Sequence, residues 1–369
     1  MRILHIAYRL PPEPGGMELH IERLIRAQLP RGHEVIVAHR RGELPRGTAP
    51  MPLTRTGASR AVSLKSDEIA FAMECAEALS RVAAPDVIHL HGDHREALAL
   101  GSAARRLGIP LMLHIHGALT MRHRAIMPWA FRHVGGFIVA GTRPRADLHT
   151  VGIPDRLIRM TSAGLDVGRL AGFRDSGRVR RGLIISVGSL VKVKNHELTI
   201  EAFHRVRAVR PDARLVIAGE GPERDRLQRL AATGPGIEFT GHIAPDRVYS
   251  LVNRAEVLVH SSQRLRGIGE GIPNAALEAL ALGTAVLISS ESTLDPVVPR
   301  DAYRIFRSGD AADLAARLHA LLDDDETRRR MSERGVRAAE DLDWPLVAAR
   351  IERWYEMVTS HRVPVLTAR

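Results

Sequence analysis

The stretch GLIISVGSLVKVKN, residues 182–195, begins the clearest strand–loop–helix unit in this chain. Its first part is a short, almost wholly apolar run, which is typical of a strand buried on both faces of a parallel sheet. A polar loop follows, and then a helix is predicted over 195–209. The unit recurs in the apolar runs ARLVIAGEG, IEFTGH, AEVLVHSS and AVLISS, which alternate with predicted helices at 222–232, 245–253 and 274–282. The alternation predicts a doubly wound α/β domain.

The first half of the chain follows the same plan, with strands predicted at RILHIAY, EVIVAH, PDVIHLHG, IPLMLHIHG and GGFIVAG. Between the halves, residues 162–182 are rich in glycine and charge and show no clear period, so we interpret them as a linker. We therefore predict an N-terminal Rossmann-like domain over 1–165, a C-terminal one over 166–345, and a helix in 346–369 that crosses back to the N-terminal domain. Two such domains are expected to face each other across a cleft at the carboxyl ends of their strands.

The composition is that of a globular protein of two domains. The chain has 369 residues, 45% of them hydrophobic and 26% charged, and this length exceeds one ordinary core. The single cysteine, Cys75, excludes a disulfide framework and fits a reducing compartment. The start MRILHIAYRL predicts a strand rather than a signal peptide, and no apolar run approaches the length that spans a bilayer. We expect a cytoplasmic protein.

The positive charge is unevenly distributed. The net charge is +11; residues 1–178 hold 25 Lys and Arg against 16 Asp and Glu, whereas residues 179–369 hold 28 against 26. A basic first half favours anionic partners such as phosphates, nucleic acid or a membrane surface. Only three lysines occur, and two of them, Lys192 and Lys194, lie in one loop after a predicted strand.

A second stretch, GEGIPNAALEALALGT at 269–284, places two glutamates around a helix start. Pro273 suits the first turn of a helix, so Glu270 is expected in the loop before the helix and Glu278 slightly more than one turn inside it. The first amides of a helix attract anions. Two carboxylates beside an anion site indicate a ligand that carries both phosphate and hydroxyls, although a capped surface helix explains these residues alone equally well.

Taken together, these segments resemble the retaining glycosyltransferases of family four, which have the GT-B fold. The resemblance covers about residues 2–357. It is carried by PPEPGGMELH, PDVIHLHG, HIHG, SAGLD, VGSLVKVKN, PDARLVIAGEGPERDRL, IEFTGHI, HSS and EGIPNAALEALALGTAVL. It implies the transfer of a sugar, with retention, from a nucleotide-sugar donor to a hydroxyl of a glycan or lipid-linked acceptor.

The resemblance assigns roles to the two glutamates. It implies that Glu278 accepts hydrogen bonds from the ribose hydroxyls of the donor and that Glu270 faces the donor sugar. One carboxylate can accept from both hydroxyls of a diol, and the charged acceptor strengthens both bonds. The turn between the glutamates is expected to meet sugar hydroxyls or diphosphate through its backbone; it consists of Gly271, Ile272, Pro273 and Asn274.

The lysine loop is expected to stabilise the leaving diphosphate. Negative charge grows on the departing phosphate, and a nearby cation lowers its energy. By resemblance, Lys194 is the phosphate lysine. The family usually has an arginine directly after the preceding glycine, where this chain has Ser189. Either Lys192 supplies the missing cation, or the diphosphate rests more on the backbone of Gly15 and Gly16; an ordinary solvated lysine is the alternative for Lys192.

His116 follows a predicted strand and matches the family histidine near the reacting centre. His114 alternates with it along the strand and is expected to have a structural role. Neither the histidines nor the carboxylates show metal-ligand spacing, and the family works without a bound metal, so we expect no metal and no cofactor.

In this fold the first half meets the acceptor. Residues 121–137 combine Arg122, Arg124 and Arg132 with Met127, Trp129, Phe131 and Phe137, and a basic, aromatic segment can lie at a membrane interface. An ordinary helix with its apolar residues packed inward is the alternative. We expect peripheral association with an anionic membrane, at the inner face of the cell membrane.

Three other functions fit parts of the sequence. A nucleic-acid-binding protein would suit the basic charge, but only 4% of residues are aromatic and no binding motif occurs, so we expect no nucleic acid partner. A sugar-nucleotide epimerase of the GT-B fold would need no separate acceptor. A catalytically silent, sugar-nucleotide-binding partner of another transferase would explain Ser189.

Overall fold

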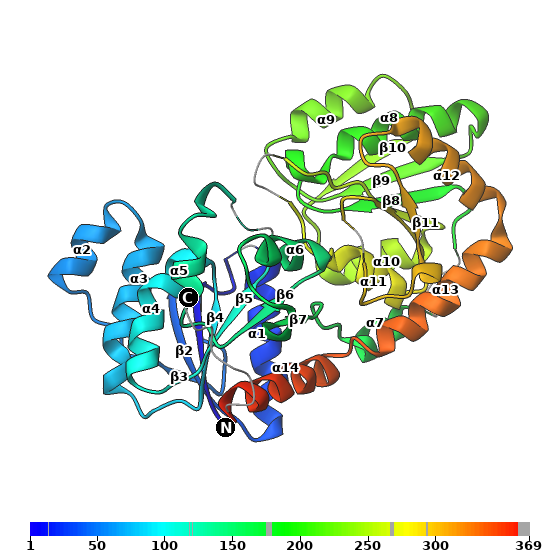
Figure 1. Ribbon diagram of the computed structural model, residues 1–369. Coiled ribbons are helices and arrows are strands. Elements are labelled where there is room, and N and C mark those ends of the chain that lie inside the picture. The colour runs from blue at the N-terminus through cyan, green and yellow to red at the C-terminus, as the bar shows by residue number, and fades with distance from the viewer. Residues whose placement is uncertain are drawn as a thin grey trace. The chain divides into compact units, whose positions relative to one another are not determined.

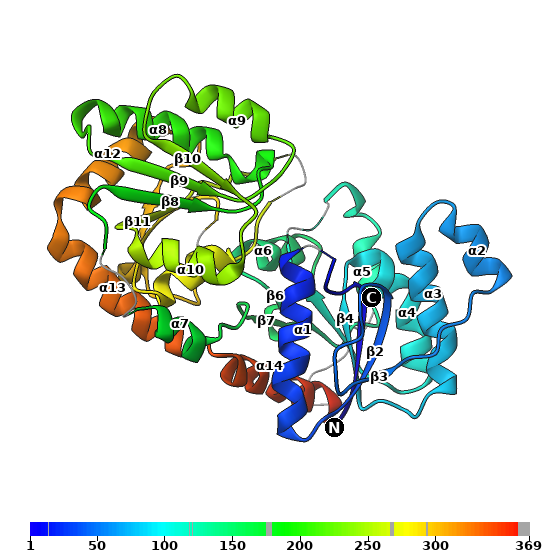
Figure 2. The same ribbon diagram turned by 180° about the vertical axis from the view of Figure 1, so that it is seen from behind.

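The structure is a computed structural model, shown in two views (Figures 1 and 2). It describes residues 1–13, 15–117, 119, 121–174, 179–265, 269–292 and 294–360. The chain forms two compact units. Met1–Gly164 and the chain from Trp344 make the first, and Leu165–Asp343 make the second.

The first unit is built on a parallel sheet of seven strands in the order β3-β2-β1-β4-β5-β6-β7. The strands are β1 (Arg2–Arg9), β2 (Glu34–Arg41), β3 (Ala49–Pro50), β4 (Val87–His91), β5 (Leu111–Ile115), β6 (Gly136–Val139) and β7 (Ile158–Met160). Within Met1–Gly164 the α-helices are α1 (Gly16–Gln28), α2 (Gly57–Ser63), α3 (Asp67–Ala78), α4 (His94–Arg106), α5 (Met127–Phe131) and α6 (Thr142–Thr150). The order of strands reverses between β1 and β4, so ligands are expected at the carboxyl ends of these strands.

The second unit has a parallel sheet of six strands in the order β10-β9-β8-β11-β12-β13. The strands are β8 (Leu183–Val187), β9 (Arg214–Ala218), β10 (Ile237–Gly241), β11 (Val257–His260), β12 (Ala285–Ser289) and β13 (Arg304–Phe306). The helices are α7 (Val167–Arg174), α8 (His196–Val209), α9 (Arg224–Ala231), α10 (Pro245–Arg254), α11 (Asn274–Ala281), α12 (Ala311–Asp323) and α13 (Asp325–Glu340). The prediction of two doubly wound α/β halves is confirmed.

The last helix, α14 (Trp344–Thr359), packs on the first unit, where it lies against α1 (Figures 1 and 2). Its apolar face is buried in the core of that unit, through Val347, Ile351, Trp354, Tyr355 and Val358. Trp344 stacks so closely on Gly164 that a Cβ there would lie 2.4 Å from its ring. The units are divided after Gly164 and after Asp343, within two residues of the boundaries drawn from the sequence.

Residues 162–182 are more ordered than we expected. A helix, α7, occupies Val167–Arg174 within the interpreted linker, and the rest of the linker includes 175–178, which lie outside the described residues. Val167, Leu170 and Phe173 recur every three residues and pack on the core of the second unit. The apolar periodicity of this helix spans only eight residues, which is too short to predict a helix from the sequence. Packing against α10 and α11 stabilises it.

Two glycines of AGEGP, after β9, let that loop press against the loop after β8. A Cβ at Gly219 would lie 2.0 Å from the carbonyl oxygen of Gly188, and one at Gly221 would lie 2.5 Å from that of Leu190. Gly219 also has a φ of +151°, which other residues rarely adopt. The close approach fixes the backbone on both sides of Ser189.

We therefore predict that Gly219→Ala lowers the free energy of unfolding by about 1–3 kcal/mol, because the added methyl group must displace backbone. Gly172→Ala is the control, since nothing lies within 4 Å of a Cβ at that exposed helical position; it should raise stability by up to about 1 kcal/mol. Urea unfolding of both variants measures the difference. Equal stability of the two would contradict the packing argument.

Candidate active site

Glu270 is the centre of a polar cluster in the second unit. It lies between β11 and α11, and its carboxylate forms an ion pair with the ammonium of Lys194. His260 Nε2 lies 2.7 Å from Oε2, and the Ser262 hydroxyl donates to the same oxygen at 2.5 Å. The cluster joins the loops that follow β8 and β11, two neighbouring strands of the sheet.

The partners of Glu270 keep it ionised. Burial raises the pKa of the Glu270 carboxyl, but the opposing effects of His260 and then Lys194 are together larger and hold the pKa well below its usual range. The site thus presents a fixed negative charge beside a fixed positive one. Such a pair can orient a ligand that carries hydroxyls next to an anionic group.

The backbone of the lysine loop is held by the segment after β11. The Ser261 hydroxyl lies 3.0 Å from the carbonyl oxygen of Lys194 and 2.9 Å from that of Asn195. The backbone N–H of Gln263 donates to the carbonyl oxygen of Val193 at 2.8 Å. Because these bonds fix the 3₁₀ turn Lys192–Lys194, the direction of the Lys194 side chain depends on β11 as well as on its own loop.

The two lysines have different surroundings. Lys192 is exposed and lines a cavity of about 420 Å³ together with Glu197, Glu223 and Arg226. Lys194 is partly buried against Glu270. Ser189 is exposed on the loop after β8. That Lys192 replaces the family's arginine stays a prediction. The surroundings of Lys192 differ from those of Lys194.

Glu278 lies on α11 and accepts a hydrogen bond at 3.2 Å from the hydroxyl of Tyr249 on α10. Tyr249 is buried, and Phe173 of α7 meets its ring edge-on with 5.6 Å between centroids. α11 begins at Asn274 with Pro273 as its N-cap, so Pro273 lies one residue before the first turn in which the sequence predicts it. Ile272 is buried and anchors the turn that starts at Gly271.

In the first unit, His116 directly follows β5 and lines a cavity of about 420 Å³. Arg9, Arg41, Glu68 and Glu96 also line it. Burial and then the neighbouring Asp93 raise the pKa of Glu96 to about 7. The cavity therefore combines hydrogen-bonding groups with charges of both signs at the carboxyl ends of β1, β4 and β5.

Gly15 and Gly16 begin α1, and Gly15 is its N-cap. A Cβ at Gly15 would lie 2.0 Å from Oε2 of Glu18, so a side chain there would displace the Glu18 carboxylate. The Glu18 carboxylate is buried in the first turn, and Arg9 Nε lies 3.2 Å from its Oε1. A carboxylate at this position interacts favourably with the helix dipole.

Several histidines far apart in the sequence gather behind His116. Two groups bring ring nitrogens within 4.8 Å of one another: His5, His89 and His91, and His20, His114 and His116. Linear spacing did not indicate this grouping, because the members come from β1, α1, β4 and β5. A signal was available: HLH and HIH each place two histidines on one face of adjacent strands. His114 is buried, and its Nδ1 lies 3.2 Å from His89 Nε2.

Sequence reasoning did not select the residues that hold the candidate residues in place, above all His260, Ser262 and Tyr249. His260 and Ser262 belong to HSS, which was noted only as part of the resemblance. Their position at the end of a buried strand was the available signal, because such ends carry ligands in this kind of sheet. Tyr249 on an amphipathic helix gave no signal of its own.

The basic, aromatic segment 121–137 divides in the structure. Met127, Phe131 and Phe137 are buried in the core of the first unit, as the alternative of an inward-packed helix requires. Trp129 is 56% exposed, and the Arg132 guanidinium lies 4.2 Å from its ring centroid. Among the residues that the structure describes, no helix is both long and apolar enough to cross a bilayer.

Comparison with known proteins identifies the family. Residues 14–169 match the family model for Glycosyltransferase Family 4, and residues 173–337 match that for Glycosyl transferases group 1. The two models together span most of the chain.

The chain belongs to the family-four glycosyltransferases. It is 29% identical to a GDP-mannose-dependent alpha-(1-6)-phosphatidylinositol dimannoside mannosyltransferase of Mycobacterium tuberculosis, over 95% of this chain and 94% of that one. It is 26% identical to a glycogen synthase of the same organism, over 96% and 94%. The predicted family and glycosyltransferase activity are confirmed.

Solved structures confirm the GT-B fold of this glycosyltransferase. Anabaena HepE in complex with UDP-glucose aligns with a TM-score of 0.75 at 14% identity, over 96% of this chain and 99% of that one. Sucrose-phosphate synthase from Thermosynechococcus elongatus aligns with a TM-score of 0.76 at 17% identity, over 97% and 99%.

We predict that Lys194→Met lowers kcat about 10²-fold or more, the usual scale when one group that stabilises developing charge is removed. Turnover with a saturating nucleotide-sugar donor measures this. Wild-type kcat in Lys194→Met would remove the lysine from the catalytic machinery.

Lys192→Met is the matched comparison, because it removes a lysine from the same turn. A clear loss in this variant would mean that Lys192 replaces the arginine absent at Ser189. An unchanged kcat would assign the diphosphate to other groups.

Proposed function

We propose that this glycosyltransferase moves a hexose, with retention of its anomeric configuration, from a nucleoside diphosphate sugar to a hydroxyl of a lipid-linked or glycan acceptor. The observation that carries the proposal is the Glu270–Lys194 ion pair, held within one unit beside the start of α11. This arrangement supplies an anionic acceptor for sugar hydroxyls and a cation for the leaving phosphate.

The donor binds the second unit. Glu278 accepts from the ribose hydroxyls, with its carboxylate oriented by the Tyr249 hydroxyl. Lys194 neutralises the diphosphate, and the backbone of the turn Gly271–Asn274 offers donors at the positive end of α11. HepE, which has the same fold, has been crystallised with UDP and with UDP-glucose, and this supports a nucleotide-sugar donor.

The acceptor binds the first unit, in the cavity lined by His116. Arginines line this cavity, and the relative from Mycobacterium tuberculosis is named for a phosphatidylinositol dimannoside; both observations support a lipid-linked acceptor with an anionic headgroup. Lys194 and the dipole of α11 provide positive charge, so we propose that transfer needs no metal or other cofactor. The acceptor hydroxyl bonds to the anomeric carbon on the face from which the phosphate leaves, and the leaving phosphate accepts the hydroxyl proton. Attack on that face gives retention without a second protein nucleophile.

The direct test of the proposal is product analysis. Incubation with UDP-glucose or GDP-mannose and a phosphoinositide acceptor should yield a glycoside whose anomeric configuration, read by NMR coupling constants, matches that of the donor. An inverted product would overturn retention. Conversion of the donor sugar without an acceptor would indicate the epimerase, and donor binding without turnover would indicate the silent partner.

We predict that Tyr249→Phe weakens binding of the donor about 3- to 10-fold, because Glu278 loses the hydroxyl that orients it and one hydrogen bond to a charged group contributes about 1 kcal/mol or more. Tyr303→Phe is the control, since it removes a hydroxyl 3.1 Å from Asp295 in the same unit. Calorimetric titration with the active donor measures both affinities. Equal affinities in the two variants would contradict the role of Glu278.

We also propose reversible binding of the basic first half to anionic membranes. Each basic residue near such a surface contributes about 1 kcal/mol, and the attraction fades over roughly 8 Å at physiological salt. Neutralising Arg122, Arg124 and Arg132 together should therefore reduce sedimentation with anionic vesicles, and added salt should do the same. The prediction rests on the charges rather than on the aromatic residues of the segment, because Trp129 is exposed whereas Phe131 and Phe137 are buried.

The control neutralises three exposed arginines of the second unit, Arg229, Arg247 and Arg264. Equal losses in the two triple variants, or equal recovery with neutral and anionic vesicles, would contradict a membrane contact at 121–137.

A further inference from the structure

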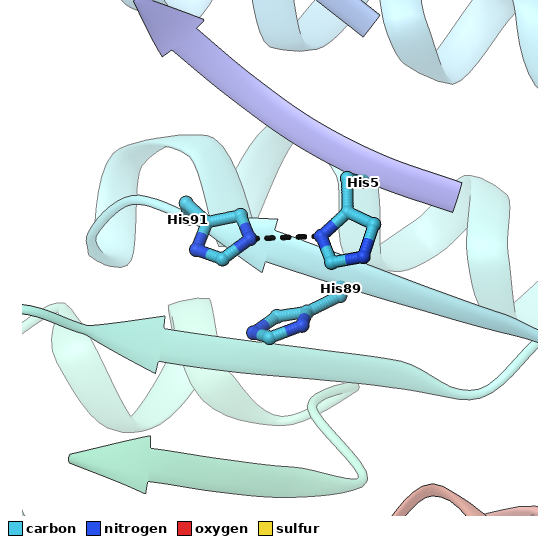
Figure 3. A group of neighbouring side chains, drawn as sticks. All are labelled: His5, His89 and His91. Carbon is cyan, nitrogen blue, oxygen red and sulfur yellow. Dashed lines mark hydrogen bonds between the residues drawn. The ribbon is translucent and has the colours of Figure 1, made fainter. Parts of the chain in front are cut away.

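Behind His116, buried imidazoles form a continuous hydrogen-bonded chain across the first unit. His5 on β1 and His91 on β4 contact each other through Nδ1 and Nε2 at 3.0 Å, with His89 beside them (Figure 3). His91 Nδ1 lies 3.0 Å from His116 Nε2. At the other end, His5 Nε2 lies 2.8 Å from the Gln28 side-chain oxygen, on the last residue of α1.

Each imidazole of this chain is neutral. Burial is the first cause that lowers the pKa of His5 to about 4, and it also brings the pKa values of His91 and His116 well below the usual range. A neutral imidazole has one N–H donor and one acceptor nitrogen. The direction of one hydrogen bond in the chain therefore fixes the direction of all the others.

Gln28 sets that direction. Its side-chain oxygen lies against His5 Nε2 and can only accept, and its side-chain nitrogen donates to the Tyr355 hydroxyl at 3.3 Å. His5 must then donate from Nε2 and accept at Nδ1. It follows that His91 donates from Nε2 and accepts at Nδ1, and that His116 donates from Nε2. The remaining nitrogen of His116, Nδ1, carries a lone pair.

We propose that Gln28, acting through His5 and His91, is a positioning residue that fixes His116 in the Nε2-protonated tautomer. His116 then presents Nδ1 as a hydrogen-bond acceptor on a side chain that lines the cavity of about 420 Å³. Its use in accepting a hydrogen bond from a hydroxyl of the sugar or the acceptor rests on the proposed function. The tautomer itself follows from the chain of hydrogen bonds.

A metal ion fits these histidines less well than the chain does. His89 has both ring nitrogens engaged, Nδ1 with the Tyr355 hydroxyl and Nε2 with His114 Nδ1. The facing nitrogens of His5 and His91 are 3.0 Å apart, closer than the roughly 3.3 Å between two nitrogens at about 2.0–2.1 Å from a tetrahedral ion. In the second group, His114 and His116 stack nearly parallel at 4.0 Å, so their ring edges do not converge on one ion.

The tautomer can be read directly in the full chain labelled with ¹⁵N-histidine, by long-range ¹H–¹⁵N correlation, with His116 assigned from its absence in His116→Asn. We expect one tautomer, protonated at Nε2. Protonation at Nδ1 would overturn the proposal. The tautomer is read in the wild-type chain and needs no transferase activity; His116→Asn serves only to assign the resonances. The proposal can therefore fail separately from the proposed function.

Two variants test the role of Gln28. Gln28→Leu removes the terminal acceptor and should leave His116 in a mixture of tautomers, with kcat about 10-fold lower, the lower end of losses seen when an outer partner of a functional histidine is removed. His94→Phe is the control, because His94 is buried in the same unit but pairs with His123, Nε2 to Nδ1 at 3.1 Å, outside the chain to His116. It should keep the wild-type tautomer.

A single tautomer in Gln28→Leu, or an equal change in His94→Phe, would overturn the proposal. So would stoichiometric binding of added zinc that shifts the resonances of His5 and His91, since coordination requires lone pairs on the two nitrogens that face each other.

Discussion

The ion pair between Glu270 and Lys194 imposes the strongest constraint on the second unit. A partly buried carboxylate and ammonium must contact each other closely, because neither is well hydrated there. The loops after β8 and β11 must therefore converge, and Ser261, His260 and Ser262 hold them at that distance. Gly219 and Gly221 allow the neighbouring loop to press against the β8 loop from the other side. The proposed donor site depends on this packing.

In the first unit the main constraint is the burial of several histidines. Its cavity is lined by His116, whose function depends on which ring nitrogen carries the proton. Buried imidazoles cannot become charged without a large cost, so they stay neutral and form a directional chain. The chain ends at Gln28 and Tyr355, and Tyr355 belongs to α14. The C-terminal helix therefore contributes a polar contact to this network as well as apolar packing.

Charge in this glycosyltransferase is divided between two tasks. A few charges are fixed at partly buried positions, as in the cluster around Glu270, and these act at short range on a bound ligand. Many others are exposed arginines on the first half, where they act at longer range and are screened by salt. The almost exclusive use of arginine makes Lys194 distinctive, since its single ammonium acts as a compact point charge rather than a planar fork.

The sequence by itself determined the two α/β halves, a helix start near Pro273 and the family, because strand–helix alternation and the motifs after strands are local patterns. It did not show α7, whose few apolar residues form a helix only against α10 and α11. It also did not show which lysine meets Glu270, or that histidines from β1, β4 and β5 form one chain. Those contacts join residues 25 to 86 positions apart. Only the parallel pairing of strands, which brings their carboxyl ends to one edge, places such residues together.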